Sequence, residues 1–174
     1  MAGITHDNVR GVGDYATLVK WNFKVLKAPA GVTTPPNINF RVLSTDVPKT
    51  DAGQTTDIWV RGHRVRQPGI YKSMDTFTVT LAETVDNAIS TWIRNWREQC
   101  WATKTGIQAL KSDTEAIIQI ERLNRQNTAI WQYTCHGVFL EDYDPTGGPL
   151  DGENSDILRP TMTLSMDYFE DSAV

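Results

Sequence analysis

Acidic and hydroxyl side chains recur between residues 142 and 153 at the spacing of a calcium-binding loop. Gly147 stands at the sixth position of the pattern, where such loops turn sharply. Two features depart from the usual setting: Pro149 replaces an apolar residue, and strand-like rather than helix-like sequence flanks the loop. The pattern leaves one calcium candidate, and no other metal or cofactor is expected. Its oxygen ligands would be Asp142, Asp144, Thr146 and Glu153, at positions one, three, five and twelve.

The two cysteines, Cys100 and Cys135, are far apart in sequence and lack the CxxC spacing of a metal site. Two interpretations remain open. They could be reduced, partly buried thiols, since free cysteine is among the most buried residue types. They could also form a disulfide, within or between subunits, once the protein has left the reducing cell.

Catalysis finds no support in the remaining reactive residues. His6, His63 and His136 show no metal-ligand spacing, and no Ser or Cys has a nucleophile motif around it. The run Gly11-Val12-Gly13 lacks the third glycine of a dinucleotide site. Adjacent carboxylates such as those of residues 141 and 142 would point to opposite faces of a strand. The sequence therefore predicts a protein that is not an enzyme.

Composition places the 174-residue chain among single-domain globular proteins, with 40% apolar and 22% charged residues. Its formal charge of −4 and its lack of clustered basic residues argue against a protein that grips phosphate backbones. The densest basic group is Arg61, Arg64 and Arg66, within a mixed segment. No apolar run approaches a membrane span, and Met1–Arg10 lacks the pattern of a secretion signal. We expect synthesis in a cytoplasm and no membrane anchor.

Alternation of apolar and polar residues predicts a mainly β protein. The clearest strand lies between Thr161 and Tyr168, where apolar residues occupy every second position. A second clear strand covers Thr76–Leu81. Further strands are expected at 19–25, at 131–136 and from Ile118 onward. Another is expected to run through Ile38, Phe40 and Val42 and to stop near Val47-Pro48.

One segment, Thr84–Cys100, has helical periodicity instead. Its apolar stripe consists of Val85, Ile89, Trp92, Ile93, Trp96 and Cys100. Thr84 is the predicted N-cap. The two tryptophans on the stripe are expected to be core anchors, because aromatic side chains dominate core burial.

Two segments do not fit a compact sheet. Val47–Gly69 alternates weakly, with Gly53 and Gly62 as bends and Trp59 on the polar side, and it predicts a long projecting β-hairpin arm. An isolated hairpin is marginal in water, so this arm requires a partner. Residues 141–160 are rich in Gly, Pro and Asp and predict a long loop.

The polar positions of the predicted strands are small and uncharged over much of their length. They are either an ordinary solvated sheet face or the smooth inner wall of a channel. The candidate lumen residues are Thr76, Thr78, Thr80, Thr161, Thr163 and Ser165.

The order of these features resembles that of a known family. A strand ends at Val47-Pro48, the arm follows, and a Phe-x-Val-x-Leu strand (77–81) leads into the helix with its two tryptophans. The chain closes on Asp167-Tyr168-Phe169-Glu170. Over about Trp21–Glu170 this order resembles the tail tube proteins of contractile-tailed phages, especially the T-even type. It is similar in outline to the haemolysin-coregulated tube proteins of type VI secretion.

The resemblance implies a single domain over residues 1–174: a small antiparallel β-barrel or sandwich with one flanking helix and a stacking arm. Subunits of that family form hexameric rings that stack into a tube, through which the genome passes during sheath contraction. The implied partners are copies of itself, the sheath, tape measure, baseplate and tail terminator proteins, and double-stranded DNA that passes without specific binding. The implied location is the virion tail tube, assembled in the host cytoplasm. The implied inter-ring residues are Val47, Pro48, Ile58, Trp59, Val60 and Arg64.

Long stretches at 101–113 and 141–160 depart from the family pattern. They concern the outer surface that would face the sheath and not the core fold. One alternative is the tube subunit of a type VI secretion or extracellular contractile injection system. An alternative of another class is a β-sandwich module that binds sugars or peptides, with Trp59 and Trp131 as platform residues.

Overall fold

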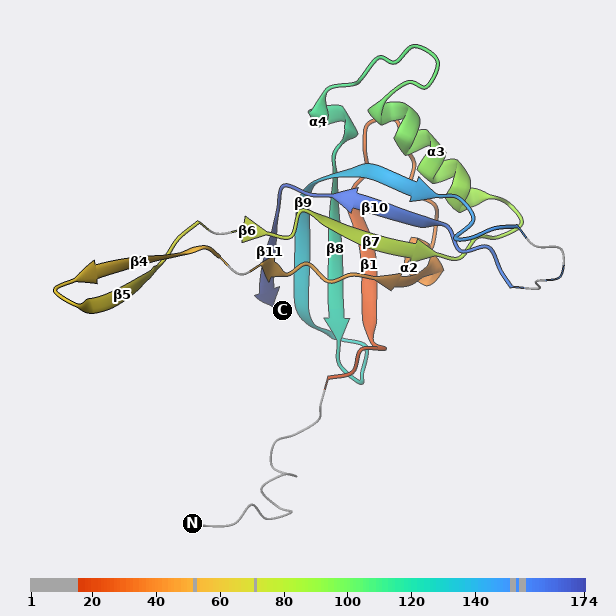
Figure 1. The fold of residues 1–174 in the computed structure, drawn as a ribbon. Helices are drawn as coiled ribbons and strands as arrows, with labels where there is room; N and C mark the ends of the chain where they lie inside the picture. The colour runs from red at the N-terminus through yellow and green to blue at the C-terminus, as the bar shows by residue number, and fades with distance from the viewer. Residues whose placement is uncertain (1–15, 52, 71, 151–152, 154–155) are drawn as a thin grey trace.

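The computed structural model describes residues 16–51, 53–70, 72–150, 153 and 156–174. It is mainly antiparallel β-structure (Figure 1). Strands of the main sheet follow the order β1-β8-β9-β10-β7-β2, and β11 pairs with β9. Their bounds are β1 (Trp21–Lys27), β2 (Val42–Thr45), β7 (Thr76–Leu81), β8 (Ala116–Leu123), β9 (Ala129–Asp144), β10 (Thr161–Ser165) and β11 (Tyr168–Ala173).

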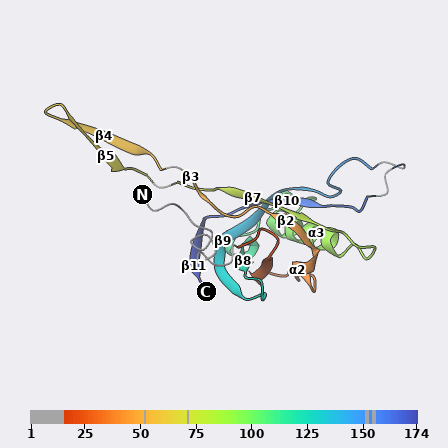
Figure 2. The same ribbon diagram turned by 90° about the horizontal axis from the view of Figure 1, so that it is seen from below.

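The long strand β9 belongs to both layers of the fold. Up to Val138 it pairs with β8 and β11, and from Phe139 onward it pairs with β10. The change occurs next to Gly137, which has a φ of 63°. The first layer therefore contains β1, β8, β11 and the start of β9, and the second contains β2, β7, β10 and the end of β9. Figure 2 shows the two layers one above the other.

The sequence left a barrel and a sandwich open, and the structure is an open sandwich. Strands β1 and β2 are the two ends of the sheet path and do not pair with each other within the described residues. The alternation in β7 places Phe77, Val79 and Leu81 in the core, each at most 1% exposed. Buried residues of both layers form one apolar cluster with the helix α3 (Ala88–Cys100).

The predicted role of the helix tryptophans as core anchors is confirmed. Trp92 and Trp96 are 2% and 0% exposed, and their ring centroids lie 5.5 Å apart. The Trp96 indole Nε1–H donates to the backbone oxygen of Thr114, in the short helix α4 (Lys111–Thr114), at 3.0 Å. This bond satisfies a polar group that burial would otherwise penalise.

The predicted start of the helix is wrong by three residues. Asn87 is at the N-cap position with a left-handed φ of 53°, so the helix begins at Ala88 and not after Thr84. Val85 therefore lies outside the helix and is fully exposed rather than part of the apolar stripe.

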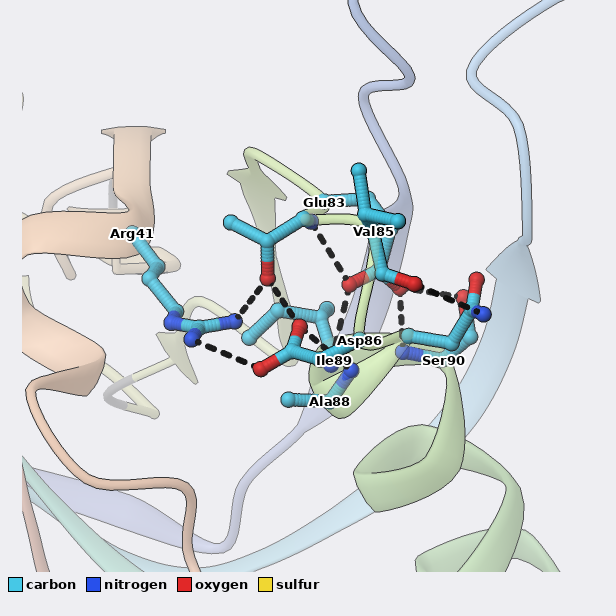
Figure 3. Close-up of polar contacts among 9 residues, drawn as sticks. Arg41, Glu83, Val85, Asp86, Ala88, Ile89 and Ser90 are labelled. Atoms are coloured by element: carbon cyan, nitrogen blue, oxygen red, sulfur yellow. Dashed lines mark hydrogen bonds and ion pairs between the residues drawn. The ribbon is translucent and has the colours of Figure 1, made fainter.

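Two carboxylates cap the helix instead of Thr84 (Figure 3). Glu83 accepts the backbone N–H groups of Ile89 at 3.2 Å and Ser90 at 2.7 Å. Asp86 accepts that of Ala88 at 3.3 Å, and Arg41 pairs with Asp86 at 3.4 Å. The first N–H groups of a helix have no partner within it, and anionic groups there also favour the helix dipole.

Three other expectations are corrected. The strand expected from Ile38 to near Val47 starts later, because Ile38–Arg41 forms the short helix α2 and β2 begins at Val42. The predicted C-terminal strand is two strands, since β10 ends at Ser165 and the chain turns at Asp167 into β11. Residues 141–144 belong to β9, so the predicted loop begins at Pro145. Within the described residues, none of the helices combines the length and apolarity needed to cross a bilayer.

Candidate assembly surfaces

The predicted hairpin arm projects from the body as a separate two-stranded sheet (Figures 1 and 2). Its strands are β4 (Thr55–Val60) and β5 (His63–Pro68), and every residue in both is exposed. The connecting residues Arg61 and Gly62 have φ values of 49° and 85°. Two consecutive positive φ values are typical of the two-residue type I′ turn, whose twist matches that of paired strands.

The arm has one apolar and one polar face. Ile58 pairs with Val65, and Val60 lies on the same face two residues further along the strand. These three side chains are 41%, 49% and 55% exposed, respectively. We call them the arm's apolar face. On the other face Asp57 forms ion pairs with Arg64 at 2.9 Å and Arg66 at 3.0 Å. Trp59, 67% exposed, shares this polar face, as the sequence predicted.

A short ladder and a close backbone contact join the arm to the body. Strand β3 (Thr50–Asp51) pairs with β6 (Lys72–Ser73) at its base. Above it the Gly69 N–H donates to the oxygen of Gln54 at 2.6 Å, and a Cβ at position 69 would lie 2.5 Å from that oxygen. Of the other inter-ring candidates, Val47 is exposed and Pro48 is buried within the subunit.

The candidate lumen residues lie together on one face of the second layer. They pair directly across β7 and β10 as Thr80–Thr161, Thr78–Thr163 and Thr76–Ser165. We call this set the Thr/Ser face. On the neighbouring strands, Asp144 and Asp142 of β9 lie opposite Thr161 and Thr163, and Ser44 of β2 lies opposite Thr80. The polar side chains paired with the Thr/Ser face are therefore neutral or acidic, and none of these described residues is basic.

The second layer ends in two strands that lack a second strand partner, although the backbone N–H of Leu140 in β9 bonds to the Cys100 thiol. Strand β2 pairs only with β7, and β9 beyond Val138 pairs only with β10, among the strands the structure describes. Unpaired strand edges present rows of N–H and C=O groups that favour pairing with another chain.

The calcium candidate is not assembled as a site. Asp142 is in β9, and Asp144 uses its carboxylate to accept the N–H groups of Thr146 at 3.0 Å and Gly147 at 3.1 Å. Those bonds lower the pKa of Asp144 and shape a turn rather than an ion cage. In the part of the chain that the structure describes, no three acidic, His or Cys side chains gather where they could hold a metal ion.

Both cysteines are buried free thiols in the subunit. Cys100 ends α3 at 6% exposure, and Cys135 in β9 is 0% exposed. Burial raises the pKa of Cys135 to about 12 and also raises that of Cys100. A thiol with a raised pKa in an apolar setting is a poor nucleophile.

The remaining candidates of the sequence are dispersed. His6 and Gly11–Gly13 lie outside the described residues. His63 is on the arm, and His136 stacks on Tyr168 with its ring centroid at 4.7 Å. The two platform tryptophans are on different elements, Trp59 on the arm and Trp131 in β9 beneath the guanidinium of Arg122 at 5.6 Å.

Sequence reasoning missed three positions that the geometry makes important. Gly137 marks the corner of β9, Glu83 caps α3 from outside the usual N-cap position, and Gly69 permits the close approach at the arm base. A lone glycine within a strand pattern is the signal that could have pointed to Gly137.

Solved structures share this fold, whereas no protein-family model and no curated protein matches the chain. A chain of the sheath–tube complex of an extracellular contractile injection system, PVC, in the extended state aligns at TM-score 0.62 and 16% identity, covering 99% of this chain and 100% of that one. The PVC sheath/tube terminator aligns at 0.65 and 14%, over 93% and 99%. The tube-terminating cap of the anti-feeding prophage aligns at 0.64 and 13%, over 93% of both chains. The chain therefore has the fold of tube and tube-terminator components of contractile injection systems.

Proposed function

We propose that this chain is a structural subunit that polymerises into the inner tail tube of a contractile-tailed phage. The observation that carries the proposal is the fully exposed arm with an apolar face. A two-stranded hairpin is marginal alone, and its apolar face is stabilised only when another surface covers it. In a tube, every arm lies next to another copy of the same chain, which can cover its apolar face.

Ring closure follows from the two end strands of the second layer. Its strand order is β2-β7-β10-β9, and every neighbouring pair is antiparallel. The two edge strands therefore run in opposite directions, so β2 of one copy meets β9 of the next in antiparallel orientation. Head-to-tail contacts of this kind close into rings when the rotation permits, and we propose the hexameric ring that the family resemblance implies.

The Thr/Ser face suits the wall of the resulting channel. Short neutral side chains flanked by Asp142 and Asp144 offer no cation to a passing phosphate backbone. Because counterion release by Lys and Arg supplies most non-specific affinity for DNA, a wall without them lets double-stranded DNA slide. The proposed partners are the sheath around the tube, the tape measure protein, the baseplate and the terminator, and the proposed location is the virion tail.

A tube subunit of an extracellular contractile injection system is the second candidate. The alignment over 99% of this chain with a chain of the PVC sheath–tube complex favours it. Fold and assembly would be the same and the cargo would be protein. Neighbouring genes distinguish the two candidates. Terminase, portal and capsid genes indicate a phage. An injection-system gene set without them indicates an extracellular contractile injection system.

Removal of the arm tests the proposal. Deleting residues 55–68 and joining Gln54 to Gly69 uses two residues that already touch. We expect the variant to keep the thermal unfolding of its body and to lose tube formation in electron micrographs. Replacing Thr105 by Ser in an exposed loop is the control and should leave tubes intact. Tubes formed by the armless variant would contradict the proposal.

A further inference from the structure

An apolar groove opens where the first layer extends beyond the second. In Figure 1 β1 and β8 continue past β7 and β2. The hollow between the two layers has a volume of about 360 Å³. It adjoins a wider hollow of about 770 Å³, and four residues line both. We call the smaller hollow the β1–β2 groove, and its main lining residues are Leu18, Lys20, Trp21, Leu43, Val47 and Arg122.

The groove is mainly apolar, and its apolar side chains are exposed among the residues that the structure describes. Leu18, Leu43 and Val47 are 97%, 46% and 44% exposed. Both cations of the lining contact groups of this chain. The Lys20 ammonium donates to Asn127 at 2.6 Å. The Arg122 guanidinium lies 5.6 Å from the ring centre of Trp131 and 5.9 Å from that of Tyr133. A contiguous exposed apolar surface with a polar rim is typical of a protein interaction site.

We propose that the β1–β2 groove receives the arm of a second copy. This inference rests on the proposed function and names the surface that the arm would occupy. The arm presents Ile58, Val60 and Val65 on one side, a narrow apolar ridge that requires an apolar recess. The subunit's own arm points away from its body, so an arm that enters this groove comes from another molecule (Figures 1 and 2).

Net charge favours contact between the arm of one copy and the body of another, whereas the groove itself is lined by the cations Lys20 and Arg122 and is selected by its apolar side chains. Residues 55–68 contain three Arg and one Asp and carry a formal charge of +2, so the rest of the chain carries −6, the difference between −4 and +2. Opposite net charge steers the arm of one copy toward the body of another. The contact joins different surfaces of identical chains, and such contacts continue from copy to copy along a filament.

Engineered cysteine pairs test the contact in assembled tubes. Pairs combine Ile58→Cys or Val60→Cys on the arm with Leu43→Cys or Val47→Cys in the groove. The native cysteines are buried and stay out of the reaction. A disulfide forms only when the two Cα atoms lie within about 7 Å. The matched control pairs Ile58→Cys with Ile107→Cys, which is 68% exposed on another loop.

We expect oxidised tubes of at least one groove pair to run as a ladder of oligomers without reductant, and the control pair to run as monomers. Hydrogen exchange of unmodified tubes is a second measurement that needs no variant. Amides of Thr17 and Leu18, which line the groove outside the β2 edge, should exchange about ten-fold more slowly, or more, in tubes than in free subunits. Tubes with neither cross-link nor added protection would overturn the groove assignment and leave the tube function standing. An unmodified protein that never forms tubes would overturn both.

Discussion

Asp167 lies directly against the backbone of Gly137, at the corner where β9 leaves one layer of the sandwich and enters the other. The backbone N–H of Asp167 donates to the oxygen of His136 at 3.0 Å, and its carboxylate pairs with Lys111. A Cβ at position 137 would collide with that carboxylate. The turn between β10 and β11 is therefore fixed against the bend in β9, and both layers depend on this contact.

Replacing Gly137 by Ala is expected to destabilise the subunit more than the same change at a glycine with open space around it. The substitution combines strain at a φ of 63° with the collision at Asp167. Gly106→Ala is the matched control, because its φ is 68° and nothing lies within 4 Å of an added Cβ. We expect a cost of about 1 kcal/mol for the control, from left-handed strain alone. The cost at Gly137 should exceed it by up to about 1 kcal/mol, because the exposed Asp167 carboxylate must give up its ion pair with Lys111 to make room. Urea unfolding measures both, and equal costs would contradict the corner's role.

Replacing Glu83 by Gln should destabilise the protein in a pH-dependent way. Burial raises the pKa of this carboxyl, but hydrogen bonds from Ser90, Thr84 and Ile89 outweigh that effect, so the pKa lies below its ordinary 4.5. Because the folded-state pKa is lowered, the stabilisation is present above the ordinary value and is lost as the pH falls through the folded one.

The Glu83→Gln variant should therefore be less stable by about 1 kcal/mol at neutral pH, the usual worth of a helix cap. Thermal unfolding across pH measures the difference, which should narrow as the pH falls below the ordinary 4.5 and close below the lowered folded-state pKa of Glu83. A difference that stays constant down to acid pH would mean that the charged cap contributes nothing.

Lysines on the Thr/Ser face should make assembled tubes bind DNA. Thr78 and Thr163 pair directly, so Thr78→Lys with Thr163→Lys places two cations side by side on the proposed wall. We expect the variant tubes to retain short duplex DNA with an affinity that falls as salt rises, whereas wild-type tubes retain little. Thr105→Lys, in an exposed loop, is the control. Equal retention by both lysine variants would place the Thr/Ser face outside the channel.

The buried thiols should be unreactive in the folded subunit. Burial raises the pKa of Cys135 to about 12, so its thiolate is scarce at neutral pH. We expect a maleimide to label neither cysteine in buffer and both in denaturant. The same burial leads us to expect one monomer band for tubes with or without reductant. Oligomer bands that vanish with reductant would instead support the inter-subunit disulfide.

Sequence periodicity predicted the elements whose conformation depends mainly on residues close in sequence. Period-two alternation identified β7, and the tryptophan stripe identified α3 and its buried face. The arm was predictable because its weak alternation fits no core.

The errors in the predicted elements arise where contacts with residues distant in sequence determine the local structure. The alternation of apolar and polar residues continues through Asp167, but β10 ends at Ser165. The chain turns after it, where Asp167 lies against Gly137. At 38–42 the strand pattern is overridden because Asn39 accepts the N–H of Phe23 in β1 at 2.7 Å. Sequence also carried no information on register, which is what brings the Thr/Ser face together across β7 and β10.

A helical reconstruction of the assembled protein by electron cryo-microscopy tests the central claim most directly. The account predicts stacked rings in which the arm of each copy contacts the adjacent ring and the Thr/Ser face lines the channel. A particle that stays monomeric at every concentration, or a tube with the Thr/Ser face turned outward and the arm in solvent, would contradict it.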